Sequence, residues 1–167
     1  MVKFNRRGFI VVGASFLVSS CTSFAFDSAT KPNQLNQAII LQKINQARAA
    51  NGVKPFGYNL KLEKATKIHS NLMASKNKMS HEIGGTLCER VSKVGYFGAV
   101  GENLGNGYQT LEEVIEGWLA SPGHRATLLS KKFSEFGLAQ ALAITPNGST
   151  RYYWTLIAGG SAKAWLN

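Results

Sequence analysis

The sequence predicts an α+β domain in which helices come first and strands follow. Before residue 130, apolar residues recur every three to four positions in several segments, which is the spacing of helices with one buried face. After residue 135, two apolar runs flank the turn Pro146-Asn147-Gly148-Ser149, and an Asn-Gly step between such runs is typical of an antiparallel hairpin. Helices and strands do not alternate along the chain, which argues against a doubly wound parallel sheet.

Two helices are predicted over about 35–50 and 59–78. Asn51-Gly52 is suited to end the first helix and Asn59 to begin the second, with Pro55 in the loop between them. The predicted inward residues are Ile40, Ile44 and Ala47 in the first helix, and Leu62, Ala65, His69, Leu72, Met73 and Lys76 in the second. We therefore expect His69 to be a core histidine.

Shorter elements follow. Thr86 can cap a third helix with Val91 and Val94 inward, and the five glycines in 95–107 predict an irregular or extended segment. Thr110 can cap a fourth helix, whose first turn carries Glu112 and Glu113, as the helix dipole favours, and whose inner face holds Val114, Ile115 and Trp118. Pro122 is expected to end that helix, residues 125–129 to add one short turn, and residues 136–144 and 152–158 to form the hairpin strands.

The N-terminus has the features of an export signal. Lys3, Arg6 and Arg7 precede an apolar stretch over 8–18, which is too short to span a bilayer. Val18-Ser19-Ser20-Cys21 then matches a bacterial lipobox, so Cys21 is the expected lipidation site and the membrane the expected partner of its lipid. Arg6-Arg7 is also compatible with twin-arginine export. The alternative is cleavage after Ser23-Phe24-Ala25, which would release a soluble secreted protein.

These features divide the chain into four parts: a signal peptide with lipobox (1–21), a tether (22–34), the folded domain (35–160) and a C-terminal tail (161–167). The chain has 167 residues and a formal net charge of +10, and its leader holds three of the cations and no acid. The remaining excess favours anionic surroundings such as phospholipid headgroups or wall polymers. Cys88 is the second cysteine, and a buried, unreactive thiol is expected there.

A set of ordered motifs resembles the cysteine-rich secretory, antigen 5 and pathogenesis-related (CAP) superfamily, in its bacterial single-domain branch. The matching residues are Asn45, Arg48 and Gly52; Ala65, His69 and Met73; Ser80-His81; Arg90 and Gly95; Gly101-Glu102-Asn103; Trp118; Ser121-Pro122-Gly123-His124-Arg125 with Leu128 and Leu129; Gly137; and Tyr153-Trp154. The resemblance implies an α-β-α sandwich, with a central antiparallel sheet between helical layers. It also implies a cleft lined by the histidine and glutamate motifs.

The resemblance implies a cleft tetrad of two histidines and two glutamates, of which this chain keeps three. His81, Glu102 and His124 match three positions, and Ser121 stands where the second glutamate is expected. Two imidazoles, a carboxylate and water suffice for an open zinc site, so a divalent metal at His81, Glu102 and His124 is one hypothesis. A hydrogen-bonded network of the same three side chains, with no cofactor required, is the other.

Two classes of function remain open from the sequence. We predict an exported cell-envelope lipoprotein that acts as a binding or interaction module, with an anionic envelope polymer, a lipid or an envelope protein as partner. Nucleic acid is not an expected partner, because the chain is exported and has no aromatic-basic motif. The alternative is a metal-assisted or acid-base hydrolase of envelope peptides or saccharides that uses His81, Glu102, His124 and Ser121.

Overall fold

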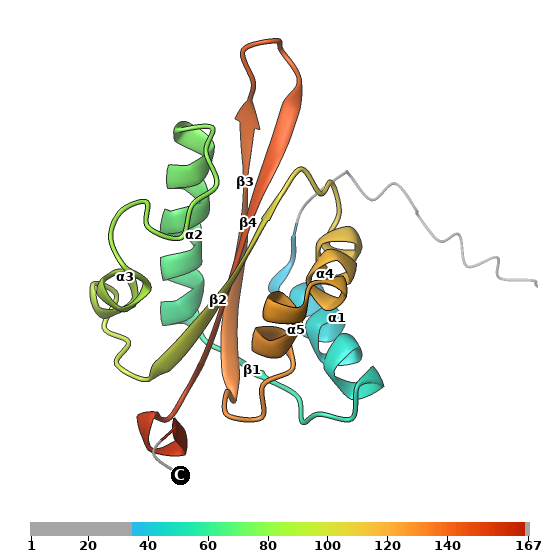
Figure 1. Cartoon of the computed structure of the whole chain (residues 1–167), viewed down its shortest axis with the longest axis vertical. Helices are drawn as coiled ribbons and strands as arrows, with labels where there is room; N and C mark the ends of the chain where they lie inside the picture. The colour runs from blue at the N-terminus through green and yellow to red at the C-terminus, as the bar shows by residue number, and fades with distance from the viewer. Residues whose placement is uncertain (1–34, 166–167) are drawn as a thin grey trace, which may run out of the picture. The chain divides into compact units, whose positions relative to one another are not determined.

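The computed structural model describes residues 35–165, and the predicted signal peptide, the lipidation site Cys21 and the tether lie outside them. The described residues form a sheet between two layers of helices, which confirms the predicted α-β-α sandwich (Figure 1). One face of the sheet carries α2 (Leu60–Ser75) and α3 (Leu87–Ser92), and the other carries α1 (Gln37–Ala50), α4 (Leu111–Ala120) and α5 (Pro122–Leu128).

The sheet has four strands in the order β1-β3-β4-β2. Strands β3 (Glu135–Ile144) and β4 (Thr150–Gly160) form the predicted antiparallel hairpin, in which Ile144 pairs with Thr150. Strand β2 (Ala99–Asn106) runs antiparallel to β4 along one edge. The short β1 (Gly57–Tyr58) pairs in parallel with β3 at the other edge. The functional residues described below gather at the β2 edge.

Helix starts follow the predicted caps. The Asn59 side chain accepts hydrogen bonds from the amides of Lys61 and Leu62, and Thr86 and Thr110 each form a reciprocal capping box with the glutamate three residues later. At the end of α1, Asn51 is the C-cap and Gly52 has a φ of 67°. These local contacts set where each helix begins or ends before any tertiary packing is considered.

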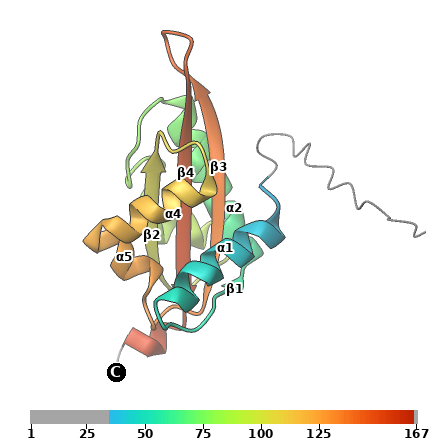
Figure 2. The same cartoon turned by 90° about the vertical axis from the view of Figure 1, so that its right-hand side faces the viewer.

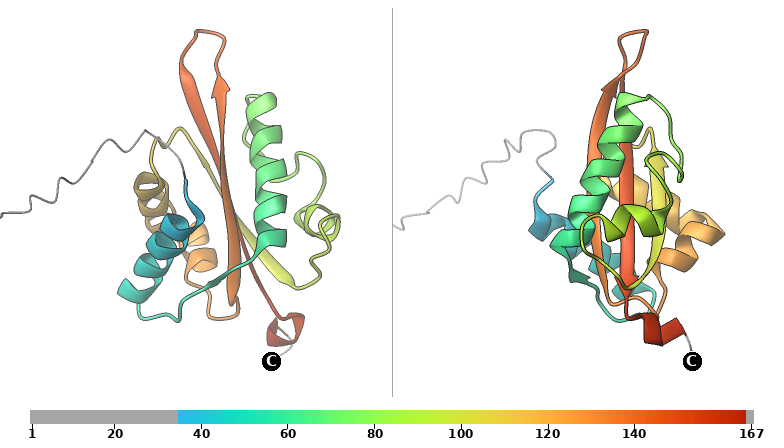
Figure 3. Two further views of the ribbon diagram at one scale, coloured as in Figure 1. Left: turned by 180° about the vertical axis from the view of Figure 1, so that it is seen from behind. Right: turned by 90° about the vertical axis from the view of Figure 1, so that its left-hand side faces the viewer.

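Apolar side chains fill both sides of the sheet. On the face covered by α1, α4 and α5 (Figure 2), Trp118 and Trp154 are buried beside Phe136 and Leu156, as predicted for Trp118. On the face covered by α2 and α3 (Figure 3, right), Leu62 and Ile157 are among the buried residues. Gly101 lets strand β2 lie close to Phe133 and Thr127, because a Cβ there would meet the Phe133 ring and the Thr127 methyl group.

No helix within residues 35–165 is long and apolar enough to cross a membrane.

The structure corrects several local predictions. Helix α2 ends at Ser75, because Asn77 has a φ of 46° that a helix does not allow, and Lys76 is exposed. Pro122 begins α5 instead of only ending α4, and 99–106 is a regular strand. The expectation of a buried Cys88 is wrong: Leu87 and Val91 take the inward side of α3, and the thiol is exposed.

Candidate functional site

A buried carboxylate on the edge strand β2 is the centre of the site. The Glu102 side chain is 3% exposed and extends toward the layer of α2 and α3. Arg90 holds it in a bidentate grip: Nη1 donates to Oε1 at 2.8 Å and Nη2 donates to Oε2 at 2.9 Å. Such paired, charge-assisted hydrogen bonds fix the plane and the position of a carboxylate. Glu102 is therefore anchored to the fold and is not a mobile side chain.

Arg90 also fixes the loop that carries His81. The arginine lies in α3, which Thr86 and Glu89 cap, and its Nε donates to the Gly85 carbonyl at 3.2 Å. Its Nη2 donates further to the backbone carbonyl of His81 at 2.9 Å. One buried guanidinium thus joins α3, the loop before it and strand β2.

The imidazole of His81 completes this network at the surface. Its Nδ1 lies 2.8 Å from Glu102 Oε2, while 56% of the side chain is exposed. Because a carboxylate oxygen only accepts, Nδ1 carries the proton and donates, as in other histidine-carboxylate pairs. In the neutral ring, Nε2 is then the free acceptor. The pair presents one oriented imidazole nitrogen to an incoming ligand.

A second histidine lies behind the carboxylate. His69, on α2, is 1% exposed, and its Nε2 lies 3.9 Å from Glu102 Oε1. Burial lowers the pKa of His69, and the opposing effect of the Glu102 charge is smaller, so this ring stays neutral at neutral pH. The predicted core position is confirmed. Its place beside Glu102 was not predicted, although its helical spacing and its membership of the matching motifs both singled it out.

His124 approaches the same strand from the other helical layer. It lies in α5 and is half-buried, and its backbone carbonyl accepts a hydrogen bond from Asn103 Nδ2 at 2.8 Å. Burial lowers the pKa of His124, and the charge of His81 lowers it further, which places the two imidazoles within electrostatic reach of each other. Glu102 and Asn103, adjacent on a strand, thus point to opposite layers.

Ser121 occupies a structural position between two helices. It is the C-cap of α4 and the N-cap of α5, and its carbonyl accepts from the Arg125 amide at 2.8 Å. Within the described part of the chain, no hydrogen bond joins its hydroxyl to His81 or His124. The geometry of a serine nucleophile with its base is therefore not formed here.

In the observed geometry, the predicted ligands His81, Glu102 and His124 do not form a metal centre. Among residues 35–165, no group of three or more His, Cys, Asp or Glu side chains is placed to hold a metal ion. Both Glu102 oxygens already accept hydrogen bonds from Arg90, and His81 Nδ1 faces one of them. A metal would therefore have to take His81 Nε2 and His124, with no carboxylate freed for it. The prediction of a metal at these three residues stays a prediction.

Two hollows occur elsewhere on the domain. One, of about 130 Å³, has His69 and Arg90 in its wall together with apolar residues of α2. The other, of about 470 Å³, lies between the loop after α1 and the loop before β3. Neither is lined by His81, Glu102 or His124, so the three predicted site residues lie outside both hollows.

Comparisons with known proteins agree with this fold. The sequence model described as "CAP: Cysteine-rich secretory protein family" matches residues 41–157. Two Bacillus subtilis proteins are similar in sequence: YkwD, 29% identical over 102 residues, and the membrane protein YlbC, 30% identical over 103 residues. Each match covers 59% of this chain, and 40% and 30% of the respective relatives. The chain therefore spans less than half the length of either relative.

Solved structures show the same fold at low sequence identity. An outer surface protein of Borrelia burgdorferi has a TM-score of 0.63 and 21% identity, over 74% of this chain and 91% of that one. An extracellular protein of Bacillus anthracis with an SCP domain also has a TM-score of 0.63, with 22% identity, over 74% of this chain and 40% of that one. These neighbours are extracellular or outer-surface proteins of bacteria.

Proposed function

Because the chain belongs to the cysteine-rich secretory protein family, we propose that it is an exported cell-envelope protein that binds its partner through the His81–Glu102 pair. The observation that carries this proposal is the oriented imidazole: Glu102 holds Nδ1 of an exposed ring, and Arg90 holds Glu102. The buried Arg90–Glu102 ion pair thus holds the exposed side chain of His81 in one orientation. Such an arrangement suits recognition, because a fixed donor or acceptor loses little freedom on binding.

The burial and the hydrogen bonds of the Glu102 carboxylate favour binding over hydrolysis. A general base must be free to take a proton from water or substrate. Here both oxygens of Glu102 accept from Arg90 or His81, and the side chain is buried. Ser121 lacks a hydrogen-bonded base. Acid-base hydrolysis would therefore rest on the two imidazoles of His81 and His124, and within residues 35–165 no nucleophile or second carboxylate is hydrogen-bonded to His81.

The partner we propose is an anionic envelope polymer, a lipid or an envelope protein, and the anchor is a lipid on Cys21. The excess of cations that remains without the leader supports an anionic partner, and the extracellular or outer-surface setting of the structural neighbours supports the compartment. If the host has two membranes, the residue after Cys21 is Thr22 and not the aspartate that favours inner-membrane retention, so the outer membrane is the proposed destination.

The binding proposal is tested by cosedimentation of the purified full-length chain with isolated envelope material. His81→Gln is the informative variant, because the ring is exposed and the fold does not depend on it. We expect His81→Gln to reduce the bound fraction several-fold, and Lys64→Gln, an exposed change on α2, to leave it nearly unchanged. Equal binding by wild type and His81→Gln would reject the site. Release of wall fragments or peptides that stops in His81→Gln would replace binding with hydrolysis.

The anchor is tested separately by Cys21→Ser. We expect palmitate labelling in the wild type and a soluble, unlabelled product in the variant, because the thiol is the acceptor of the lipid. Membrane retention that is unchanged in Cys21→Ser would refute acylation. An unlabelled wild type found in the medium would favour cleavage after Ala25 and a soluble secreted protein.

A further inference from the structure

The larger hollow is a cationic site that is separate from the His81–Glu102 pair. It measures about 470 Å³ and lies between the loop that follows α1 and the loop that precedes β3. This is within the usual size of small-ligand sites. Its lining residues are Arg48, Gly52, Val53, Lys54, Pro55, Lys131, Phe133 and Ser134. Three of them are cations and none is an acid.

Arg48 lines this hollow as a buried cation, and no carboxylate within residues 35–165 pairs with it. It is 1% exposed, and its hydrogen bonds run to the backbone carbonyls of Lys54, Leu128 and Ser130 at 2.6–3.3 Å. Its guanidinium carbon lies 3.4 Å from the centroid of the Phe56 ring. Carbonyls and an aromatic face solvate the group but carry no net charge, so the positive charge of Arg48 remains uncompensated.

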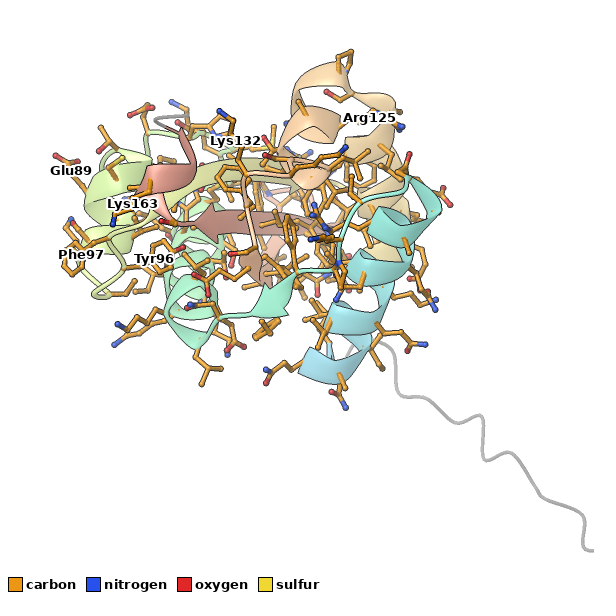
Figure 4. The ribbon with its side chains drawn as sticks, turned by 90° about the horizontal axis from the view of Figure 1, so that it is seen from below. Glu89, Tyr96, Phe97, Arg125, Lys132 and Lys163 are labelled. Atoms are coloured by element: carbon orange, nitrogen blue, oxygen red, sulfur yellow. The ribbon has the colours of Figure 1, made fainter. Side chains whose placement is uncertain are left out.

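The rim of the hollow adds positive charge. Lys54 and Lys131 are exposed, and within residues 35–165 neither forms an ion pair with a carboxylate. Glu135 follows this loop but is turned away: its carboxylate accepts from Asn59 and from Tyr96, on the side of α2 and α3. Figure 4 views the domain from this end and labels Lys132 on the loop before β3 and Arg125 on α5, two more cations.

We propose that this hollow binds a phosphate ester, with the phosphate between Lys54 and Lys131 above Arg48. A phosphate carries enough charge and enough acceptor oxygens to use several cations at once. The volume exceeds what a bare phosphate fills, and Val53, Pro55 and Phe133 offer apolar wall for the body of the ligand. The ligand class is therefore a phosphate ester with a partly apolar body.

The test is calorimetric titration of the purified full-length chain with inorganic phosphate and with glycerol phosphate. The informative variant is Lys54→Gln/Lys131→Gln, which keeps the backbone carbonyl that Arg48 uses and removes only the rim charges. The matched control is Lys64→Gln/Lys76→Gln, which removes the same charge from exposed positions on or next to α2. We expect saturable binding that weakens about tenfold or more in the first variant and little in the second, because charge-assisted contacts carry most of the affinity.

Two results would overturn the proposal: no saturable binding of either probe, or equal weakening in the two double variants, which would show only a long-range effect of net charge. Vesicles then identify the source of the phosphate. Binding to phosphatidylglycerol vesicles beyond that to phosphatidylcholine vesicles, lost only in Lys54→Gln/Lys131→Gln, assigns the hollow to a lipid headgroup. Binding of glycerol phosphate without this difference assigns it to a soluble ester. Any contribution of the leader to vesicle binding is common to all variants and cancels in the comparison.

Discussion

The grip of Arg90 on Glu102 is the contact on which the local structure of the site depends. Both distances are under 3 Å, whereas His69 Nε2 stays 3.9 Å from the carboxylate. Removing one partner of a buried pair leaves the other charge uncompensated, which costs more than the pair itself contributes. His81 takes its position from this pair, because Arg90 holds its backbone carbonyl and Glu102 holds its ring.

Replacing Arg90 is therefore expected to destabilise the domain. Arg90→Met should lower the free energy of unfolding by about 3–5 kcal/mol, because the buried Glu102 charge loses its arginine partner and keeps only the hydrogen bond to His81. The double variant Arg90→Met/Glu102→Gln should recover part of that loss, since no charge is then isolated. Urea denaturation measures both, with Arg151→Met, an exposed arginine, as the control. A double variant less stable than Arg90→Met would contradict this account.

Zinc affinity provides a second test of the residues. With Glu102 held by Arg90, only His81 Nε2 and His124 are left as ligands, and two imidazoles form an incomplete zinc site. We expect weak zinc binding that is lost in either His81→Ala or His124→Ala, as measured by calorimetry. Tight, stoichiometric binding would show that Glu102 leaves Arg90 for the metal, and binding that survives both substitutions would place the metal elsewhere.

The site was predictable only in part. His81, Glu102 and His124 were nominated by motif resemblance, and the structure pairs the first two and brings the third within electrostatic reach. The role of Arg90 was not predicted, because its contact with Glu102 spans twelve residues and depends on how α3 docks against β2. Ser121 matched a family position by spacing, but its surroundings are set by the junction of two helices.

At the scale of elements, contact between α2 and β3 depends on one glycine. A Cβ at Gly137 would overlap the backbone of α2 at Leu62 and Glu63, and backbone cannot move aside as a flexible side chain can. Gly137 in β3 therefore sets how closely the helix lies against the sheet. Gly123 in α5, in contrast, has open space where a side chain would start.

These two glycines make a matched pair of substitutions. Gly137→Ala should lower the free energy of unfolding by about 3 kcal/mol or more, because the helix must shift from the sheet. Gly123→Ala should be neutral or stabilise by about 0.5–1 kcal/mol, since alanine is the better helix former. Thermal unfolding distinguishes them, and equal midpoints would show that α2 adjusts without cost.

Element boundaries set by local chemistry were predicted better than those set by packing. Asn59, Thr86 and Thr110 cap helices as expected, because capping needs only residues within one turn. Pro122 was expected to end a helix, yet proline also fits the first position of one, and it begins α5. The two-residue β1 carries no periodicity of its own and exists only through its pairing with β3.

At the scale of the whole domain, two imidazoles make stability depend on pH. Burial lowers the pKa of His69, and burial with the charge of His81 lowers that of His124. The unfolded chain then binds protons at a higher pH than the folded one. The contribution of these two histidines to stability is therefore fully present above their unfolded-state pKa of about 6.5. It is lost as the pH falls through that value toward the folded-state pKa.

We expect the denaturation midpoint to fall on acidification between about pH 7.5 and 5. His69→Gln should reduce the slope of stability against pH in this range by up to about 1.4 kcal/mol per pH unit, because one group that protonates on unfolding is removed. Urea denaturation at a series of pH values measures the slope. Parallel curves for the wild type and His69→Gln would show that the buried ring does not contribute.

The division of the site between a rigid part and a loop has an evolutionary consequence. Arg90 and Glu102 belong to a helix and a strand, whereas His81 comes from the turn between α2 and α3. Mutations that exchange residues of this turn alter what is displayed at the rim without disturbing the packed layers beneath. Homologous domains are then free to diversify their ligands by drift in one short stretch, while selection for folding acts on the rest.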